Sequence, residues 1–190
     1  VIILSYKKRD LILFLKILAI LLAIIAIVSP WWNITGSTSN PNFETSTKLY
    51  LVPTEMVTII SNNNVSAGEL ASLDNSFTDV VSLFPIMITI SILCIFANLI
   101  FNKYTMKKSS ILAFLLAILF IIGSNFVFYI AMSELGNVTV GNFLGSGDIN
   151  FAIPGENMDI PISSSWGPDI GFYLLIGSVV VLILSFCLFL

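Results

Sequence analysis

Four long apolar runs, separated by polar stretches, dominate the chain. A hydrocarbon layer about 30 Å thick is crossed by roughly 20 apolar residues in an α-helix. The runs that meet this length cover residues 11–29, 83–101, 111–132 and 170–190. The pattern therefore predicts a membrane all-α four-helix bundle with these runs as its transmembrane helices. Residues 1–10 and 102–110 are left as short polar segments, and residues 30–82 and 133–169 as two long loops.

Both long loops carry strand-like patterns. Residues 48–60 are rich in β-branched and aromatic residues, and residues 137–162 alternate between apolar and polar positions, with Gly and Pro between the runs. Pro53 indicates an edge strand or a bulge, and residues 61–77 indicate a turn and a short helical approach to the second span. An isolated hairpin is only marginally stable. We therefore expect the two loops to pair into a small antiparallel β cap over the helix ends.

The charges predict the orientation. Positive charges gather beside the first span and in the short link, as Lys7, Lys8, Arg9, Lys103, Lys107 and Lys108. Lys48 is the only basic residue in the long loops, which hold 10 acidic residues. The positive-inside rule then predicts a multi-pass plasma membrane protein with cytoplasmic termini and extracellular long loops. Lys16 lies early in the first span and is expected to extend its ammonium back to the cytoplasmic side.

A cleaved signal peptide is the alternative interpretation of the first span. Its charged start fits that interpretation, but its apolar core is too long. Pro30 followed by two tryptophans also makes a poor cleavage site. The sequence therefore favours a retained membrane helix.

Composition limits the classes of function. Hydrophobic residues make up 57% of the chain and charged residues 10%, against about 25% charged residues in a soluble domain. There is no basic excess for nucleic acid. The chain has no His, the commonest metal ligand and general base. The acids of the second long loop lack the spacing of a calcium-binding loop, and Cys94 and Cys187 lie in apolar runs as expected for small hydrophobes. We expect no enzyme activity, cofactor or metal ion.

Aromatic residues and sequons mark the predicted membrane edge. Trp31 and Trp32 directly follow Pro30, and Trp166 and Tyr173 lie at the start of the fourth span. These four aromatic residues are expected at headgroup depth, where an indole N–H stays hydrated. Candidate glycosylation sites, all in the predicted outer loops, are Asn33, Asn64 and Asn137.

Small and polar residues within the spans indicate how the helices pack. Small residues that allow close helix approach are Ala19, Ala23, Ala113, Ala117, Gly171, Ser178 and Ser185. The polar residues within the spans are Ser91, Asn98 and Asn125. Buried polar groups in a membrane line transport paths or hold helices together, and the sequence leaves both roles open.

The layout resembles the claudin-like four-transmembrane (tetraspan) superfamily. The local matches are Pro30-Trp31-Trp32 after the first span and the sequence WGPDIGFYLLIG at the entry to the fourth. The resemblance implies that Trp31 or Trp32 packs at the membrane edge of an extracellular sheet built from both loops. The paired loop cysteines and the Gly-Leu-Trp motif of claudins are missing, and Asp79 stands where claudins tend to carry arginine. Barrier or paracellular-pore function is therefore not implied.

The sequence predicts a non-enzymatic integral membrane protein. We expect it to act as a structural, adhesion or accessory subunit of a larger cell-surface or membrane complex. Its partners would be the lipid bilayer and other membrane or cell-surface subunits, further copies of itself among them. Two alternatives stay open: a small oligomeric channel or transporter lined by Asn98, Asn125 and the serines, and an accessory subunit of a quinone-linked respiratory complex.

Overall fold

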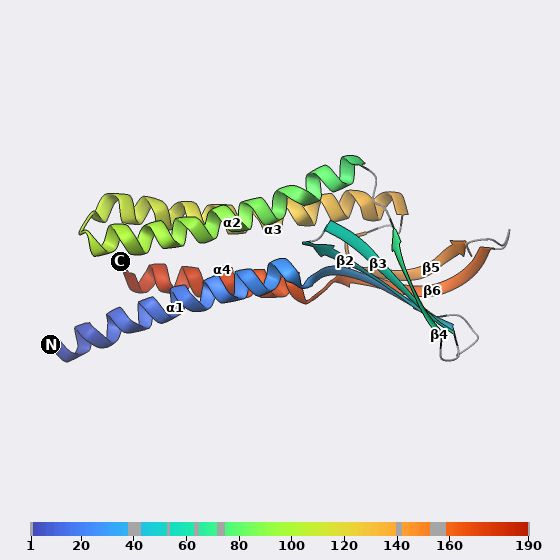
Figure 1. The fold of residues 1–190 in the computed structure, drawn as a ribbon, viewed down its shortest axis with the longest axis horizontal. Coiled ribbons are helices and arrows are strands. Elements are labelled where there is room, and N and C mark those ends of the chain that lie inside the picture. Colours follow the sequence, from blue (N-terminus) through green and yellow to red (C-terminus); the bar gives the residue numbers. More distant parts are fainter. Residues whose placement is uncertain are drawn as a thin grey trace.

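Four long helices carry a sheet at one end of the molecule (Figure 1). The computed structural model describes residues 2–37, 43–52, 54–62, 65–71, 75–139, 142–152 and 159–189. Within these residues the helices are α1 (Ile2–Val28), α2 (Asn75–Lys103), α3 (Lys107–Thr139) and α4 (Ile170–Phe189). Each contains a stretch long and apolar enough to cross a membrane. The fold is therefore consistent with a multi-pass membrane protein.

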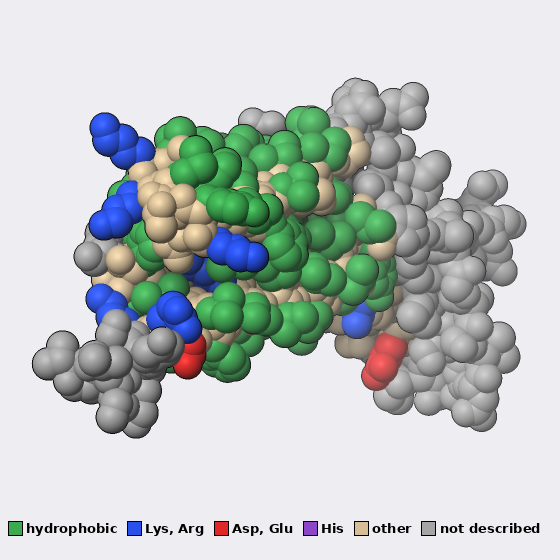
Figure 2. Space-filling view, turned by 60° about the vertical axis from the view of Figure 1, so that its left-hand side comes forward, with side chains coloured by type: hydrophobic (Ala, Val, Ile, Leu, Met, Phe, Trp, Pro, Cys, Tyr) green, Lys and Arg blue, Asp and Glu red, His purple; other side chains and the backbone are tan. Residues whose placement is uncertain are grey.

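The helices form two antiparallel pairs, α1 with α4 and α2 with α3, and both chain ends lie at the end opposite the sheet (Figure 1). Large apolar side chains remain exposed on all four helices, among them Phe14, Leu93, Leu119 and Val180. These side chains contribute to the broad apolar surface of the helical part (Figure 2). Such a surface fits a lipid environment, where apolar exposure carries no hydration cost.

Three helices are longer than the sequence predicted. Helix α1 begins at Ile2, nine residues before the predicted span, so residues 2–10, expected to precede the first span, are helical. Helix α2 begins at Asn75, eight residues before the predicted span, and α3 continues to Thr139, seven residues beyond it. Residues 137–139, predicted to be strand, are therefore helical. Alternation over so few residues does not separate a strand from the last turn of a helix.

The sheet is antiparallel and has the strand order β4-β3-β2-β1-β6-β5. Its strands are β1 (Pro30–Ser37), β2 (Phe43–Leu51), β3 (Thr54–Asn62), β4 (Val65–Ala71), β5 (Gly145–Ala152) and β6 (Asp159–Pro168). The pairing of β1 with β6 joins the first long loop to the second. This confirms the predicted association of the two loops in one small sheet.

Two details of the first loop differ from the prediction. Residues 48–60 form parts of two strands, because β2 ends at Leu51 and pairs there with Thr54, the first residue of β3. Pro53 falls between these strands and lies outside the described residues. Residues 65–71, expected as a turn and helical approach, form strand β4. The first loop thus supplies four strands.

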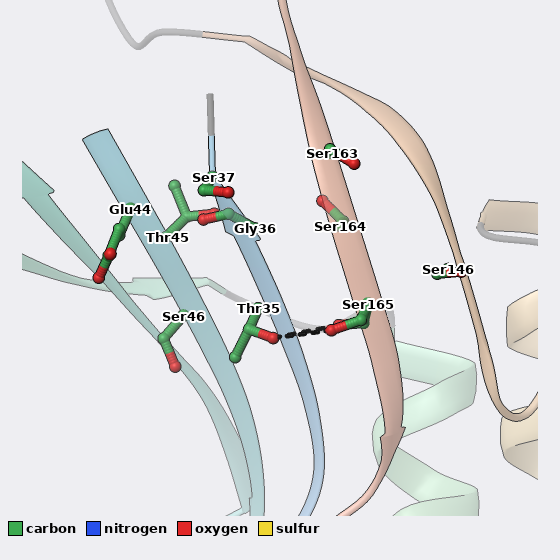
Figure 3. Close-up of a pocket in the computed structure, with 10 residues that line it drawn as sticks. All are labelled: Thr35, Gly36, Ser37, Glu44, Thr45, Ser46, Ser146, Ser163, Ser164 and Ser165. Atoms are coloured by element: carbon green, nitrogen blue, oxygen red, sulfur yellow. Dashed lines mark hydrogen bonds between the residues drawn. The ribbon is translucent and has the colours of Figure 1, made fainter. Parts of the chain in front are cut away.

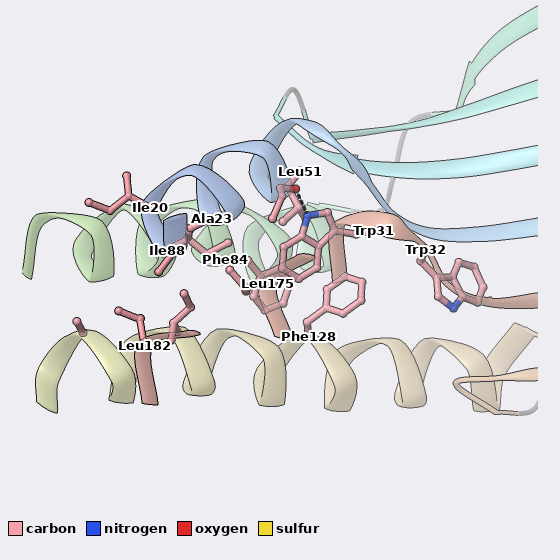
Figure 4. Packing of buried hydrophobic residues seen from close by; sticks show 14 of the residues in the cluster. Ile20, Ala23, Trp31, Trp32, Leu51, Phe84, Ile88, Phe128, Leu175 and Leu182 are labelled. Carbon is pink, nitrogen blue, oxygen red and sulfur yellow. Dashed lines mark hydrogen bonds between the residues drawn. The ribbon is translucent and has the colours of Figure 1, made fainter. Parts of the chain in front are cut away.

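Trp31 and Trp32 fill the junction between sheet and helices (Figure 4). The β1–β2 register shifts between Pro30 and Trp32, so Trp31 stands outside the regular pairing. Its indole contacts Phe128 edge-on at 4.9 Å between ring centroids and donates through Nε1 to the carbonyl oxygen of Ala26 at 2.6 Å. Trp32 Nε1 donates to the carbonyl oxygen of Phe143 at 3.2 Å.

These positions correct the expectation of hydrated indoles. Both tryptophans are buried, and both N–H groups are satisfied by backbone carbonyls. Burying an indole N–H without an acceptor is costly, so each bond also fixes the orientation of its ring. The tryptophans therefore attach the sheet to the helices.

Gly171, at the start of α4, makes this junction possible. A Cβ at this position would lie 2.6 Å from Trp31 Cδ1 and 2.9 Å from the carbonyl oxygen of Pro30. The carbonyl belongs to the backbone of β1 and cannot rotate away. Gly171→Ala is expected to destabilise the protein by about 1–3 kcal/mol, the range for overpacking a close contact, measured as a loss of thermal stability in detergent.

Gly177→Ala is the matched control in the same helix. Its Cβ would meet Leu22 Cδ1 at 3.9 Å, an ordinary contact. Alanine favours a helix over glycine by about 1 kcal/mol, so this substitution should be neutral or stabilising. Equal effects of the two substitutions would contradict the assigned role of Gly171.

Candidate functional site

Polar side chains form two rows across one face of the sheet. Directly paired residues of antiparallel strands point to the same face, and the pairing links β2, β1, β6 and β5 in that order. The first row is Ser46, Thr35, Ser165 and Ser146, and the second row is Glu44, Ser37, Ser163 and Asp148. All eight are exposed except Ser46, which is half-buried. We call these eight residues the hydroxyl face.

The hydroxyl face borders a hollow of about 600 Å³ (Figure 3). Thr35 Oγ1 and Ser165 Oγ lie 3.0 Å apart and share a hydrogen bond across β1 and β6. Thr45 and Ser164 also line the hollow, and their hydroxyls donate to the carbonyl oxygens of Gly36 and Ile162. The exposed serine hydroxyls can each donate one hydrogen bond and accept two.

Thr45 and Ser164 belong to the opposite face, which is packed where it carries Trp166. Trp166 is nearly buried there and donates through Nε1 to the carbonyl oxygen of Asn142 at 2.8 Å. A Cβ on Gly145 would lie 2.8 Å from this indole, so glycine lets the ring rest directly on β5. The indole N–H of Trp166 was expected to be hydrated, and it bonds to a backbone carbonyl instead. The position of Trp166 at headgroup depth stays a prediction.

The hydroxyl face offers hydrogen-bond donors and acceptors on neutral side chains. Each net hydrogen bond to such a group contributes about 1 kcal/mol. Glu44 and Asp148 stand at the two ends of the second row. In the described ranges no group of three or more His, Cys, Asp or Glu side chains comes close enough to hold a metal ion.

The three sequons have different settings. Asn33 lies in β1, half-buried, and its Nδ2 donates to Asp169 Oδ2 at 3.1 Å. Asn64 lies outside the described residues. Asn137 falls in the last turn of α3, and its side chain also lies outside the described part. Glycosylation stays a prediction, and at Asn33 the sugar would have to attach to an amide that already bonds to Asp169.

The predicted packing residues lie at helix contacts. Buried small residues are Ala19, Ala23, Ala113, Ala117 and Gly171. Ser178 Oγ donates to the carbonyl oxygen of Ala19 at 2.9 Å and Ser185 Oγ to that of Ile12 at 3.5 Å, which joins α4 to α1. Ser91 Oγ donates to the carbonyl oxygen of Ala117 at 2.7 Å and joins α2 to α3. Tyr173, by contrast, is exposed at the start of α4.

The two asparagines of the predicted spans are not brought together. Asn98 Nδ2 donates to the backbone and side-chain oxygens of Ser110, at 2.7 and 2.9 Å. Asn125 lies 15 residues further along α3 than Ser110, about 22 Å at 1.5 Å per residue. Its Nδ2 donates to the carbonyl oxygen of Ile121, and its buried Oδ1 has no hydrogen-bond partner among the described residues.

Lys16 is the residue whose position the sequence predicted wrongly. Its exposed fraction is 1%, and Nζ donates to Asn98 Oδ1 at 2.6 Å. The ammonium also lies 4.8 Å from the ring centroid of Phe114 and 4.9 Å from that of Phe189. The side chain therefore turns inward among α2, α3 and α4. Two polar residues near the basic link, Asn98 and Ser110, could have indicated that a buried hydrogen-bond partner was available to Lys16.

The fold and these surfaces define a chain with four candidate membrane-spanning helices and one antiparallel sheet. No protein-family model matches the chain, and no curated protein matches it. The claudin-like resemblance of the sequence remains a prediction.

Proposed function

We propose that this protein is a non-enzymatic subunit of a cell-surface complex, anchored in the plasma membrane by its four helices. Its hydroxyl face binds a partner outside the cell. The observation that carries the proposal is the continuous polar face across four strands, with a hollow of about 600 Å³.

The charge distribution supports an extracellular sheet. Lys8, Arg9, Lys103, Lys107 and Lys108 lie at the ends of α1, α2 and α3 that point away from the sheet, where basic side chains gather in Figure 2. Basic residues flanking membrane helices favour the cytoplasmic side. The sheet then lies on the outside, where the hydroxyl face meets water and partners.

The polar residues of the helices support a structural role over a channel. A water-filled path needs polar groups facing a common space. Ser91, Ser124 and Ser178 instead each donate to a backbone carbonyl of their own or a neighbouring helix. Asn98 and Asn125 lie at different depths along the bundle. The bonds of Ser91, Asn98 and Ser178 join neighbouring helices, as interhelical hydrogen bonds do in membranes.

The partner expected at the hydroxyl face is another membrane or cell-surface protein, or a second copy of this chain. The face offers many hydroxyls and only two charges, so its complement is a polar surface of low net charge. Many weak bonds on a flat sheet suit a lateral or adhesive contact, which is broken and remade without chemistry.

Photocrosslinking in the native membrane tests the proposal. A photoreactive amino acid at Ser46 or Ser146 should yield one discrete covalent adduct, because these positions flank the hollow from β2 and β5. The adduct mass separates a second copy of this chain from a different subunit. Ser165→Arg, which puts an unpaired charge in the middle of the face, should lower the yield from Ser146 about tenfold.

The same photoreactive residue at Tyr104 is the matched control. Tyr104 is exposed but lies in the link at the far end of the helices. If Ser46 and Ser146 give no adduct in correctly inserted protein, or only the adducts obtained from Tyr104, the hydroxyl face is not the contact surface.

A further inference from the structure

Lys16 is a buried cation without a carboxylate. Within the described residues no acidic side chain lies within ion-pair distance of its ammonium. An ammonium has three N–H donors, and Lys16 uses one of them, toward Asn98 Oδ1. A buried charge is costly unless it is paired. The site therefore has the electrostatic character of an incomplete ion pair.

The neighbours of Lys16 hold it in this position. Asn98 is fixed by its two bonds to Ser110, so its oxygen points at the ammonium. The rings of Phe114 and Phe189 approach from α3 and α4 at distances typical of cation–π contacts. The ammonium is thus placed in advance, and an arriving anion would find it already oriented.

A cavity of about 770 Å³ opens beside Lys16. Its polar lining residues are Lys8, Arg9, Asp10, Lys16, Asn102 and Lys103, and its apolar ones are Ile12, Leu13, Leu99, Leu188 and Phe189. Four of these side chains are cations and one is an acid. Asp10 lies 4.0 Å from Arg9, and both are largely exposed. We call this space the basic cavity.

We infer that the basic cavity binds the phosphate of an anionic phospholipid from the surrounding leaflet. The phosphate accepts hydrogen bonds from the exposed Lys8 and Lys103 at the mouth, and the positive charge of the buried Lys16 attracts it at the inner end. Phosphate oxygens complement ammonium groups well, because hydrogen bonds between charged groups are about twice as strong as neutral ones.

The apolar lining favours a lipid over a soluble phosphate. Leu13 lines the cavity and is also exposed on the outer surface of α1, so the cavity opens toward the lipid-facing side. Leu99 and Leu188 continue the apolar wall from α2 and α4. A headgroup in the cavity would leave its acyl chains along these residues. Basic pockets between membrane helices at the cytoplasmic side are known binding places for anionic headgroups.

Lipid titration of the full-length protein tests the inference. The purified protein in neutral detergent is titrated with phosphatidylglycerol, with phosphatidylcholine or with inorganic phosphate, and bound lipid and thermal stability are measured. We expect phosphatidylglycerol to bind and stabilise in preference to phosphatidylcholine. The K8Q/K103Q double variant should raise its apparent dissociation constant about tenfold, because two charge-assisted bonds are lost.

K107Q/K108Q is the matched control. Both lysines are exposed at the same end of the bundle, and neither lines the basic cavity. This variant removes the same charge, so it should change binding less than twofold if the cavity is the site. Equal losses in the two double variants would show general attraction to the basic end and overturn the inference.

The remaining outcomes are also decisive. Lys16→Met should weaken phosphatidylglycerol binding further than K8Q/K103Q does. If inorganic phosphate alone stabilises the protein and displaces the lipid, the cavity binds the anion, but its source is soluble and the lipid assignment is wrong. Equal binding of phosphatidylglycerol and phosphatidylcholine, or no binding of either, would contradict the proposal that the basic cavity binds an anionic lipid.

Discussion

Asn98→Leu is expected to cost about 2–3 kcal/mol, the upper part of the range for losing a hydrogen bond to a charged group. The substitution takes away the hydrogen-bond acceptor that the structure shows for the Lys16 ammonium. A buried cation then remains with only two aromatic faces beside it. The loss is measured as reversible unfolding in mixed micelles, with helical content followed by circular dichroism.

A double-mutant cycle separates this effect from lost packing. Lys16→Met keeps a long apolar chain and removes the charge, so it should cost about 1–3 kcal/mol for the amide oxygen that it leaves unpaired. The K16M/N98L double variant removes both partners and should recover most of the stability lost in N98L, since replacing a whole buried polar pair by apolar groups is often neutral.

Asn125→Leu is the matched substitution elsewhere in the bundle. In the part of the chain that the structure describes, Asn125 Oδ1 has no hydrogen-bond partner and Nδ2 donates to the carbonyl oxygen of Ile121 in its own helix. We therefore expect a change of less than about 1 kcal/mol. An N98L protein no less stable than N125L would contradict the role assigned to the Lys16–Asn98 contact.

Trp31→Ala is expected to cost about 3–5 kcal/mol, the usual range for truncating a buried aromatic side chain. The substitution removes the edge-on contacts with Phe128 and Phe172 and the bond to the Ala26 carbonyl. Trp31 connects the sheet to the helices, so the W31A/W32A double variant should loosen the sheet more than the bundle. Limited proteolysis of the protein in detergent should then cut residues 30–74 first.

Tyr173→Ala provides the comparison for this variant. Tyr173 is an aromatic residue near the same junction, but it is 56% exposed. Its removal should leave both stability and protease resistance close to those of the unchanged protein. A W31A/W32A protein whose sheet is digested no faster than that of the parent would refute the assignment of the two tryptophans as attachment points.

The four helices could be predicted because each apolar run is long enough to be unambiguous. The residues at which the helices begin and end could not be predicted. Residues 133–139 are polar enough to look like a loop, yet α3 continues through them. The association of the two loops followed from the instability of isolated hairpins. The register of β1 against β2 shifts between Pro30 and Trp32, and both indoles are buried there. This shift depends on how Trp31 packs against α3 and α4, so no sequence pattern predicts it.

The position of Lys16 and the hydroxyl face also depend on tertiary structure, so the sequence did not predict them. Whether Lys16 extends outward or turns inward depends on the rotation of α1 about its axis, which a nearly uniform apolar helix does not reveal. In the run from Ser163 to Ser165, alternation does not show which serine is buried, because all three residues are alike. The structure buries Ser164 and exposes its two neighbours. The hydroxyl face emerges only when four strands are aligned.

The strand order has a mechanical consequence. Strand β1 follows α1 after Ser29 alone, and β6 leads into α4 through Asp169 alone, so the two neighbouring strands β1 and β6 continue the paired helices α1 and α4. A pull along these strands therefore runs directly from β1 into α1 and from β6 into α4. The α2–α3 pair joins the sheet through β4 and β5, its outermost strands. Tension on the sheet would therefore reach the α1–α4 pair first, and it would pass to α2 and α3 through side-chain contacts such as Trp31–Phe128 and Lys16–Asn98.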